Sequence, residues 1–408
     1  MTGPAPGRDA GPGGRAIWLL ALGQTLGYAC FFYIFAALVL DWEAALGWRP
    51  ELLAAGPTLA IVLSALLAPL AGRAVDRGLG PEILTAGAAI GGLALLGLAA
   101  ARAPWHYLAA WAGLGLAQAL CLYEVCFAFL IRRYGLAARR AIIRVTLVAG
   151  LASTLAFPAG AALAASFGWR GAVLTAAAMA FAAIVPLNAA GARAIRRSAP
   201  PPDPDTRAAA MRGDAAAARA ALSRPRFWGL GLLFALINLD HWLLISFLRP
   251  ILAEKGVAEA LAILAAATVG PAQVAGRLVL MRWEARIGTA RATFWTLLAM
   301  VAAALALLSA GATPGLVLAF AALQGAAMGV VTILRPMLTA EALGQAGYGT
   351  IAGMLSIPAL AATAAGPMLG AVILGAGGAV AVTATALVLA LAALGLARLL
   401  VSRFAPGA

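Results

Sequence analysis

Long apolar segments recur along the whole chain and are separated by short polar stretches. Each segment is long enough to cross a lipid bilayer as a helix, which takes roughly 20 apolar residues. Lipid offers no partner for backbone polar groups, so segments of this length must be helical. The pattern predicts twelve spans, at residues 17–40, 52–75, 82–102, 105–131, 141–166, 171–192, 226–253, 258–281, 290–311, 314–340, 348–374 and 378–402. We therefore expect an all-α, multi-pass membrane protein.

The composition supports this class, because 63% of the 408 residues are hydrophobic and only 11% are charged. Soluble proteins average about 45–50% apolar and about 25% charged residues. The net charge of +14 does not indicate a nucleic-acid partner, because the arginines lie in short loops between apolar segments and not on one water-exposed face. We expect the lipid bilayer to surround the chain.

The longest polar stretch, residues 193–225, divides the chain into two halves of six predicted spans. Within it, residues 206–223 are rich in Ala and Arg and can form a short helix at the membrane surface. The predicted organisation is a disordered N-terminal segment at 1–16, a bundle at 17–192, a linker at 193–225, a second bundle at 226–402 and a tail at 403–408.

Basic residues are distributed unevenly between the two sides of the predicted membrane topology. If the N-terminus is cytoplasmic, 22 of the 29 Lys and Arg residues fall on the inner side, 5 on the outer side and 2 inside helices. Cytoplasmic loops carry the excess of basic residues in membrane proteins. We therefore expect both termini in the cytoplasm and the chain in a bacterial-type cytoplasmic (inner) membrane.

Two related loops follow the second and the eighth predicted spans. The first reads Gly-Arg-Ala-Val-Asp-Arg-Gly at residues 72–78, and the second reads Gly-Arg-Leu-Val-Leu-Met-Arg at residues 276–282. This repeated turn resembles the cytoplasmic loop signature of the major facilitator superfamily. The resemblance implies two pseudo-symmetric six-helix bundles, and a monomeric secondary transporter that works by alternating access.

The loop signature has a physical interpretation as a gating latch. Gly72 permits close approach of helices, and Asp76 can lie near a helix N-terminus of the opposite half, where negative charge is favoured. The second copy has Leu280 in place of the aspartate, so we expect the stronger latch in the N-terminal half. The predicted gating residues are Gly72, Asp76, Arg77, Gly276 and Arg277.

The stretch Gly-Trp-Arg-Pro-Glu-Leu at residues 47–52, followed by the Pro-x-x-Gly-Arg-x-x-Asp-Arg loop at 69–77, resembles the monocarboxylate porter and oxalate/formate-like branch. That resemblance implies symport of a small organic anion with protons. One feature departs from it, because members of the branch often place an arginine deep in span eight to hold the substrate carboxylate. Here the span-eight arginine is Arg277, at the cytoplasmic end.

Polar residues inside the spans are the candidates for binding, because an ionisable group there costs about 2.5–3.5 kcal/mol on insertion scales. By the resemblance, the first, fourth, seventh and tenth helices line a central cavity. The candidate solute-binding residues are Gln24, Tyr28, Arg144, His241, Gln324, Thr332 and Arg335. The candidate proton-coupling residues are Glu124 and Asp240.

Span ten carries the clearest pattern. Gln324, Met328, Thr332 and Arg335 share one helical face, which we expect to line a water-filled cavity. Arg335 can then hold an anion with two parallel hydrogen bonds. Two alternatives remain, namely that Arg335 pairs with Glu341 in a gate or extends its charged end to the membrane surface.

The acids also allow two interpretations each. Glu124 can pair with Arg144 as a proton-coupling switch or as a static buried pair. Asp240, the most central acid, is either a proton site or a structural hydrogen-bonding group. His241 projects about 100° round the helix from Asp240, so it has a separate function as a solute or proton ligand, or as a satisfied polar group.

Neither a catalytic constellation nor a cofactor or metal motif is visible in the sequence, so we expect a protein that is not an enzyme. Cys30, Cys121 and Cys126 lie inside predicted helices and are interpreted as small buried hydrophobes. The leading hypothesis is proton-coupled symport of a small organic anion. The alternatives are a proton antiporter that exports apolar or cationic drugs, and a membrane receptor or sensor without transport.

Overall fold

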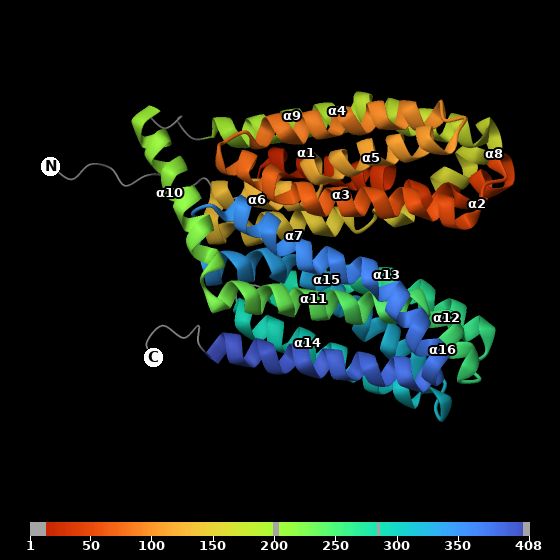
Figure 1. Ribbon diagram of the computed structural model, residues 1–408. Helices are drawn as coiled ribbons and strands as arrows, with labels where there is room; N and C mark the ends of the chain where they lie inside the picture. Colours follow the sequence, from red (N-terminus) through yellow and green to blue (C-terminus); the bar gives the residue numbers. More distant parts are fainter. Residues whose placement is uncertain (1–13, 199–203, 284–285, 403–408) are drawn as a thin grey trace. The chain divides into compact units, whose positions relative to one another are not determined.

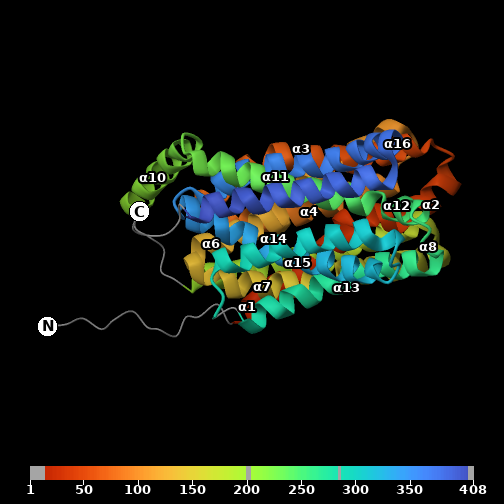
Figure 2. The same cartoon turned by 90° about the horizontal axis from the view of Figure 1, so that it is seen from below.

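The computed structural model describes residues 14–198, 204–283 and 286–402, and helices dominate throughout these ranges (Figures 1 and 2). The predicted N-terminal segment at 1–16, except for residues 14–16, and the predicted tail at 403–408 lie outside the described residues. The chain divides into two compact units, each of which is considered by itself. Unit 1 comprises residues 1–216 together with 345–350, and unit 2 comprises residues 217–344 and 351–408.

Unit 1 contains the helices from α1 to α9 and the first part of α10. Their bounds are α1 Arg15–Gly27, α2 Ile34–Leu46, α3 Pro50–Asp76, α4 Gly80–Ala99, α5 Pro104–Cys121, α6 Tyr123–Tyr134, α7 Ala138–Ala149, α8 Ala152–Met179, α9 Val185–Arg197 and α10 Pro204–Leu222. α10 confirms the helix that the sequence predicts within the linker. α7 packs beside both α1 and α6 (Figure 2).

Unit 2 contains the end of α10, the helices from α11 to α15 and most of α16. Their bounds are α11 Pro225–Ser246, α12 Leu248–Glu254, α13 Glu259–Trp283, α14 Thr289–Leu308, α15 Leu316–Leu343 and α16 Tyr348–Ser402. The predicted seventh span is interrupted at Phe247, which separates α11 from α12.

The predicted number of spans agrees with the helices. By length and apolar composition, nine stretches of the described residues can cross a membrane. The stretch Pro104–Arg197 contains the fourth, fifth and sixth predicted spans, and Tyr348–Leu400 contains the eleventh and twelfth. Gly168 and Gly378, both with positive φ, mark kinks that separate spans five from six and eleven from twelve. The prediction of twelve membrane helices in an all-α fold is therefore confirmed.

Two helices of unit 1 are broken in the middle of a predicted span. A π-helical turn at Tyr28–Phe32 separates α1 from α2 within the first span. In the fourth span the backbone of Leu122 is extended, with φ −89° and ψ −166°, so that α5 ends and α6 begins. Such breaks release backbone groups from the regular ladder, and in a membrane those groups need other partners.

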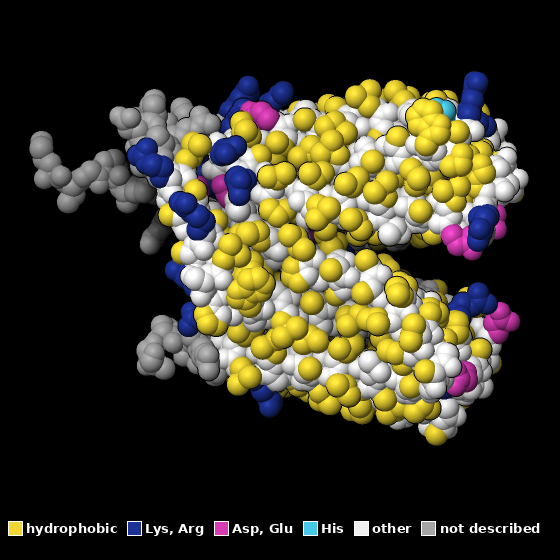
Figure 3. All heavy atoms as spheres, in the orientation of Figure 1, with side chains coloured by type: hydrophobic (Ala, Val, Ile, Leu, Met, Phe, Trp, Pro, Cys, Tyr) yellow, Lys and Arg dark blue, Asp and Glu magenta, His cyan; other side chains and the backbone are white. Residues whose placement is uncertain are grey.

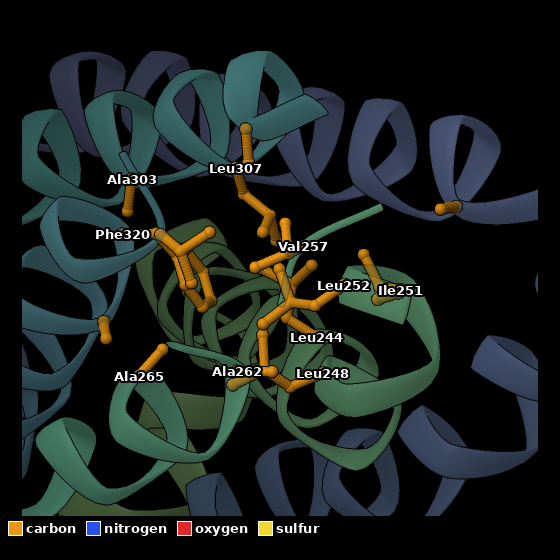
Figure 4. Packing of buried hydrophobic residues seen from close by; sticks show 14 of the residues in the cluster. Leu244, Leu248, Ile251, Leu252, Val257, Ala262, Ala265, Ala303, Leu307 and Phe320 are labelled. Atoms are coloured by element: carbon orange, nitrogen blue, oxygen red, sulfur yellow. The ribbon is translucent and has the colours of Figure 1, made fainter. Parts of the chain in front are cut away.

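One cluster of buried apolar residues in unit 2 joins α11, α12, α13, α14, α15 and α16. Figure 4 shows side chains from these helices turned toward one another, including Leu244, Ile251, Leu252, Leu307 and Phe320. All five are fully buried. This core fixes α11 and α15, the two helices that carry most of the polar candidates of unit 2.

The outer surface of each unit matches a lipid environment. In the face shown in Figure 3, hydrophobic side chains cover the middle of each unit, and the charged side chains gather near its ends. Large apolar side chains such as Leu66, Leu70 and Val372 are more than half exposed. A soluble protein rarely exposes so much contiguous apolar surface.

Candidate functional site

The clearest polar contact in unit 2 joins two of the predicted residues, Asp240 of α11 and Gln324 of α15. Nε2 of Gln324 donates a 2.8 Å hydrogen bond to Oδ2 of Asp240. The exposed fraction is 1% for Asp240 and 0% for Gln324. In the part of the chain that the structure describes, Oδ1 of Asp240 and Oε1 of Gln324 have no hydrogen-bond partner. The pair therefore offers two buried acceptor atoms and lacks donors for them.

Arg335 lies on the same helix as Gln324 but well away from this pair. Eleven residues separate Gln324 from Arg335, which is about 16 Å along an α-helix axis. The guanidinium of Arg335 is partly buried, and its Cζ lies 5.7 Å from the ring centroid of Phe234 in α11. Arg335 is therefore too distant along α15 to serve as the counter-ion of Asp240.

The other candidates in unit 2 have different surroundings. His241 is buried beside Trp242, with ring centroids 5.9 Å apart, and its Nδ1 has no hydrogen-bond partner among the described residues. The hydroxyl of Thr332 donates to the carbonyl of Gly329 in its own helix. Thr332 is therefore partly committed to the backbone of its own helix.

In unit 1 the breaks in the first and fourth spans lie against each other. Nε2 of Gln24 donates a 2.7 Å hydrogen bond to the carbonyl of Cys121, the last residue of α5 before the break. The ring of Tyr28 lies 4.4 Å from that of Tyr123, the first residue of α6. Both predicted residues of span one are therefore joined to the discontinuity in span four, and Gln24 satisfies a carbonyl that the break releases.

A second amide, Gln118, has the same kind of contact but was not among the predicted residues. Its Nε2 donates a 2.8 Å hydrogen bond to the carbonyl of Phe31 in the π-helical turn. Gln118 is a polar residue in the middle of an apolar span, so the sequence did contain a signal for it. The break at Leu122 carries no such signal, because neither glycine nor proline occurs at residues 121–123.

Glu124 and Arg144 occupy neighbouring helices of unit 1. Glu124 lies in the first turn of α6, and Arg144 lies in the middle of α7; both side chains are partly buried. Negative charge in a first helical turn is favoured by the helix dipole. A direct pair between these two side chains stays a prediction.

The first copy of the predicted gating motif, residues 72–78, takes part in a compact set of hydrogen bonds inside unit 1. The carboxylate of Asp76 accepts the backbone N–H groups of Gly349 and Thr350, at 2.9 and 2.8 Å, and the hydroxyl of Thr350 at 2.7 Å. These donors belong to the first turn of α16, whose N–H groups lack partners within the helix. Gly72 packs directly on the backbone of Gly349, and a Cβ at Gly72 would overlap the Gly349 carbonyl.

The second copy of the loop serves helix packing inside unit 2. Gly276 of α13 packs on the backbone of Ala326 in α15. Arg277 is 3% exposed, and its Nε donates a 3.2 Å hydrogen bond to the carbonyl of Gly329. This arginine is thus buried against the backbone of α15, which makes it a poor candidate for holding a solute carboxylate.

Three further residues of unit 1 surround the loop and were missed by sequence reasoning: Arg132, Asp214 and Thr350. Arg132 of α6 lies between two carboxylates, 2.8 Å from that of Asp214 and 3.8 Å from that of Asp76. A weak signal existed for Asp214, because it is the one acidic residue in the segment 206–223. Sequence spacing gives no indication that Arg132 and Asp214 come together with residues 345–350.

Comparisons with known proteins agree with this architecture. The sequence profile of the Major Facilitator Superfamily matches residues 20–308. A search of curated proteins gave no match. The crystal structure of FucP, a major facilitator transporter in the outward conformation, is similar with a TM-score of 0.72 and 15% identity, over 95% of this chain and 98% of that chain.

Two other solved structures have the same fold. A bacterial homologue of the iron transporter ferroportin, in an outward-facing state, aligns with a TM-score of 0.71 and 15% identity over 95% of this chain and 100% of that chain. The human organic anion transporter MFSD10 aligns with a TM-score of 0.65 and 20% identity, over 94% of this chain and 99% of that chain. At these identities the likeness concerns the fold alone. Together with the family profile, it identifies the chain as a member of the Major Facilitator Superfamily and as a secondary transporter.

Proposed function

We propose that this transporter is a proton-coupled symporter for a small organic anion, similar in substrate class to the monocarboxylate porter and oxalate/formate-like branch. In this proposal the two units change their relative orientation during alternating access, as in other transporters built from repeats. The protein acts as a monomer in a bacterial-type cytoplasmic membrane, with both termini in the cytoplasm. Asp240 carries the coupling proton, and Arg335 holds the anion.

The observation that carries the proposal is the Asp240–Gln324 pair. A carboxylate removed from water needs compensating charge or several hydrogen bonds, and a neutral amide that donates one bond supplies little of either. A proton on Asp240 removes the uncompensated charge. The acid is therefore suited to bind and release a proton as its access to water changes during the transport cycle.

The position of Arg335 supports a separate anion site. Arg335 is partly buried, and its guanidinium Cζ lies 5.7 Å from the centroid of the Phe234 ring, within cation–π range. A small carboxylate that touches Arg335 does not reach Gln324, given a separation of about 16 Å along α15. Proton and anion then interact through the conformational change and not by direct contact.

The experiment begins with a ligand panel on the detergent-purified protein, at acidic and neutral pH. Small carboxylates, sugars, amino acids and cationic drugs are compared by the thermal unfolding midpoint. The proposal expects a carboxylate to stabilise the protein more at acidic pH. Arg335→Ala should abolish that stabilisation, and Asp240→Asn should abolish its pH dependence.

Arg398→Ala provides the matched control, because Arg398 also lies over a phenylalanine, 5.1 Å from the Phe294 centroid, but is exposed. Proteoliposomes that contain a pH-sensitive dye then test transport directly. An inward carboxylate gradient should acidify the lumen with the wild-type protein and not with Asp240→Asn. Carboxylate binding without any flux would instead indicate a sensor.

One observation favours a second candidate, export of cationic or apolar compounds in exchange for protons. Aromatic rings gather in unit 1 beside Glu124: the Tyr28 ring lies 4.4 Å from that of Tyr123 and 5.8 Å from that of Phe32, and Tyr123 stacks on Phe127 at 4.8 Å. Aromatic faces with a nearby carboxylate are suited to organic cations. Stabilisation by tetraphenylphosphonium but by no carboxylate would replace the symport proposal with this one.

A further inference from the structure

The linker helix α10 contributes an acidic side chain to the hydrogen bonds around the first gating loop. Oδ1 of Asp214 accepts the backbone N–H of Gly347 at 2.8 Å, and Oδ2 accepts a 2.8 Å hydrogen bond from Arg132. The Asp214 side chain is only 12% exposed. All three residues belong to unit 1, in which α10 crosses the end of the unit near α6 (Figure 1).

Asp214 and Asp76 together accept three backbone N–H groups where the chain enters α16. Asp214 accepts from Gly347, and Asp76 accepts from Gly349 and Thr350. Arg132 lies within 4 Å of both carboxylates. The two acids approach the same backbone from two different helices, α3 and α10, and share one basic residue.

Electrostatics explains why this arrangement is stable. The first N–H groups of a helix have no partner within it and carry a partial positive charge, which favours acidic side chains at that end. Two carboxylates in one place would repel each other, and the guanidinium of Arg132 offsets that repulsion. Hydrogen bonds with a charged partner are roughly twice as strong as neutral ones.

The segment 345–350 belongs to unit 1, but the residues directly before it and directly after it belong to unit 2. Any movement of unit 2 that pulls on α15 or α16 therefore acts on this segment. Two sets of contacts must be broken to release it, those of Asp76 from α3 and those of Asp214 from α10.

We propose that Asp214 is a positioning residue of the gate, and that the linker helix α10 takes part in the latch instead of serving only as a tether between the halves. Asp214 fixes the entry into α16 so that Gly349 and Thr350 meet Asp76. The inference does not depend on the identity of the solute or of the coupling ion, so it stands or falls separately from proton-coupled anion symport.

Hydrogen–deuterium exchange on the full-length protein in lipid nanodiscs tests the proposal. The measured quantity is the exchange rate in peptides that cover residues 345–350. Asp214→Ala should raise it about tenfold or more, because a charge-assisted hydrogen bond to a backbone amide is lost. Asp214→Asn should rescue part of the protection, since its amide oxygen still accepts the Gly347 N–H.

Glu82→Gln is the matched control, because Glu82 also pairs with an arginine of unit 1, Arg196, but at an exposed position. It should leave exchange at 345–350 unchanged. A second readout is non-additivity. The exchange rate at 345–350 in the double variant Asp76→Asn/Asp214→Asn should rise by less than the product of the two single-variant increases, because both residues act through Arg132.

The outcomes are distinguishable from a simple loss of stability. A positioning role predicts faster exchange at 345–350 with the thermal unfolding midpoint of Asp214→Asn close to that of the wild type. The proposal is overturned if Asp214→Ala behaves like Glu82→Gln at these amides. It is also overturned if Asp214→Asn raises exchange equally throughout unit 1, because Asp214 would then be a general stability residue.

Discussion

Gln324 donates a 2.8 Å hydrogen bond to one carboxylate oxygen of Asp240, and the other oxygen of that carboxylate has no hydrogen-bond partner within the described ranges. Both side chains are buried, one in α15 and one in α11 of unit 2. An acid so sparsely compensated is stable only when it is neutral or when a donor reaches it. We therefore expect substitutions of Asp240 and of Gln324 to have opposite effects on thermal stability.

Asp240→Asn should leave the thermal unfolding midpoint unchanged or raise it, because it removes an uncompensated charge and keeps the side-chain shape. Gln324→Ala should lower stability by about 1–3 kcal/mol, because it leaves the carboxyl group without its one donor. Thermal unfolding in detergent, followed by tryptophan fluorescence, measures both variants. A strong destabilisation by Asp240→Asn would mean that the ionised carboxylate is a structural group.

Gly276→Ala should destabilise the packing of α13 on α15. The added Cβ would overlap the backbone of Ala326, and overpacking of this kind costs about 1–3 kcal/mol. Gly395→Ala in α16 is the control, because no heavy atom lies within 4 Å of a Cβ at that position. The control should be neutral or slightly stabilising. Equal midpoints for the two variants would contradict the close approach of the two helices.

Glu254→Ala should weaken the helix start after the kink in α16. Oε2 of Glu254 accepts the Ala379 N–H at 2.9 Å, next to Gly378 with φ +67°. Loss of a side-chain cap typically costs about 0.5–2 kcal/mol. Glu259→Ala is the comparison, because Glu259 is 75% exposed in its pair with Arg249 and should have little effect. A larger drop in the thermal unfolding midpoint for Glu259→Ala than for Glu254→Ala would exclude the capping role.

Asp76→Ala should reduce the protection of the first turn of α16 more than Thr350→Val does. The first change removes the acceptor of three donors, and the second removes one hydroxyl donor. Thr58→Val serves as control, because the Thr58 hydroxyl bonds within its own helix α3. Amide exchange at Gly349 and Thr350 provides the measurement. Equal protection in the Asp76→Ala and Thr58→Val proteins would remove Asp76 from the latch.

Much of the candidate chemistry was visible in the sequence for a simple reason. A polar side chain in a long apolar span stands out by its cost, so Gln24, Asp240, His241 and Gln324 could be selected without a structure. All four are buried as expected of groups with a role inside the bundle. Their hydrogen-bond partners could not be selected, because Cys121 is an ordinary apolar residue that accepts through its backbone.

Helical breaks were the features least accessible to sequence reasoning. The kinks at Gly168 and Gly378 coincide with glycines, which tolerate positive φ. Gly168 lies between the fifth and sixth predicted spans, and Gly378 is the first residue of the twelfth. The break at Leu122 coincides with neither glycine nor proline, and it depends on Gln24 binding the freed carbonyl of Cys121 from another helix. A local pattern cannot predict a break whose compensation comes from a distant residue.

The sequence by itself determined the class of the protein, its twelve spans and the candidate charged groups, because the bilayer imposes length and apolarity on every span. Only the tertiary structure decided which groups meet. It joined Asp240 to Gln324, buried Arg277 against Gly329, and brought Asp214 of the linker to Gly347. Such pairings depend on how helices pack and on where backbone N–H groups are left without partners, and neither is encoded by periodicity along the chain.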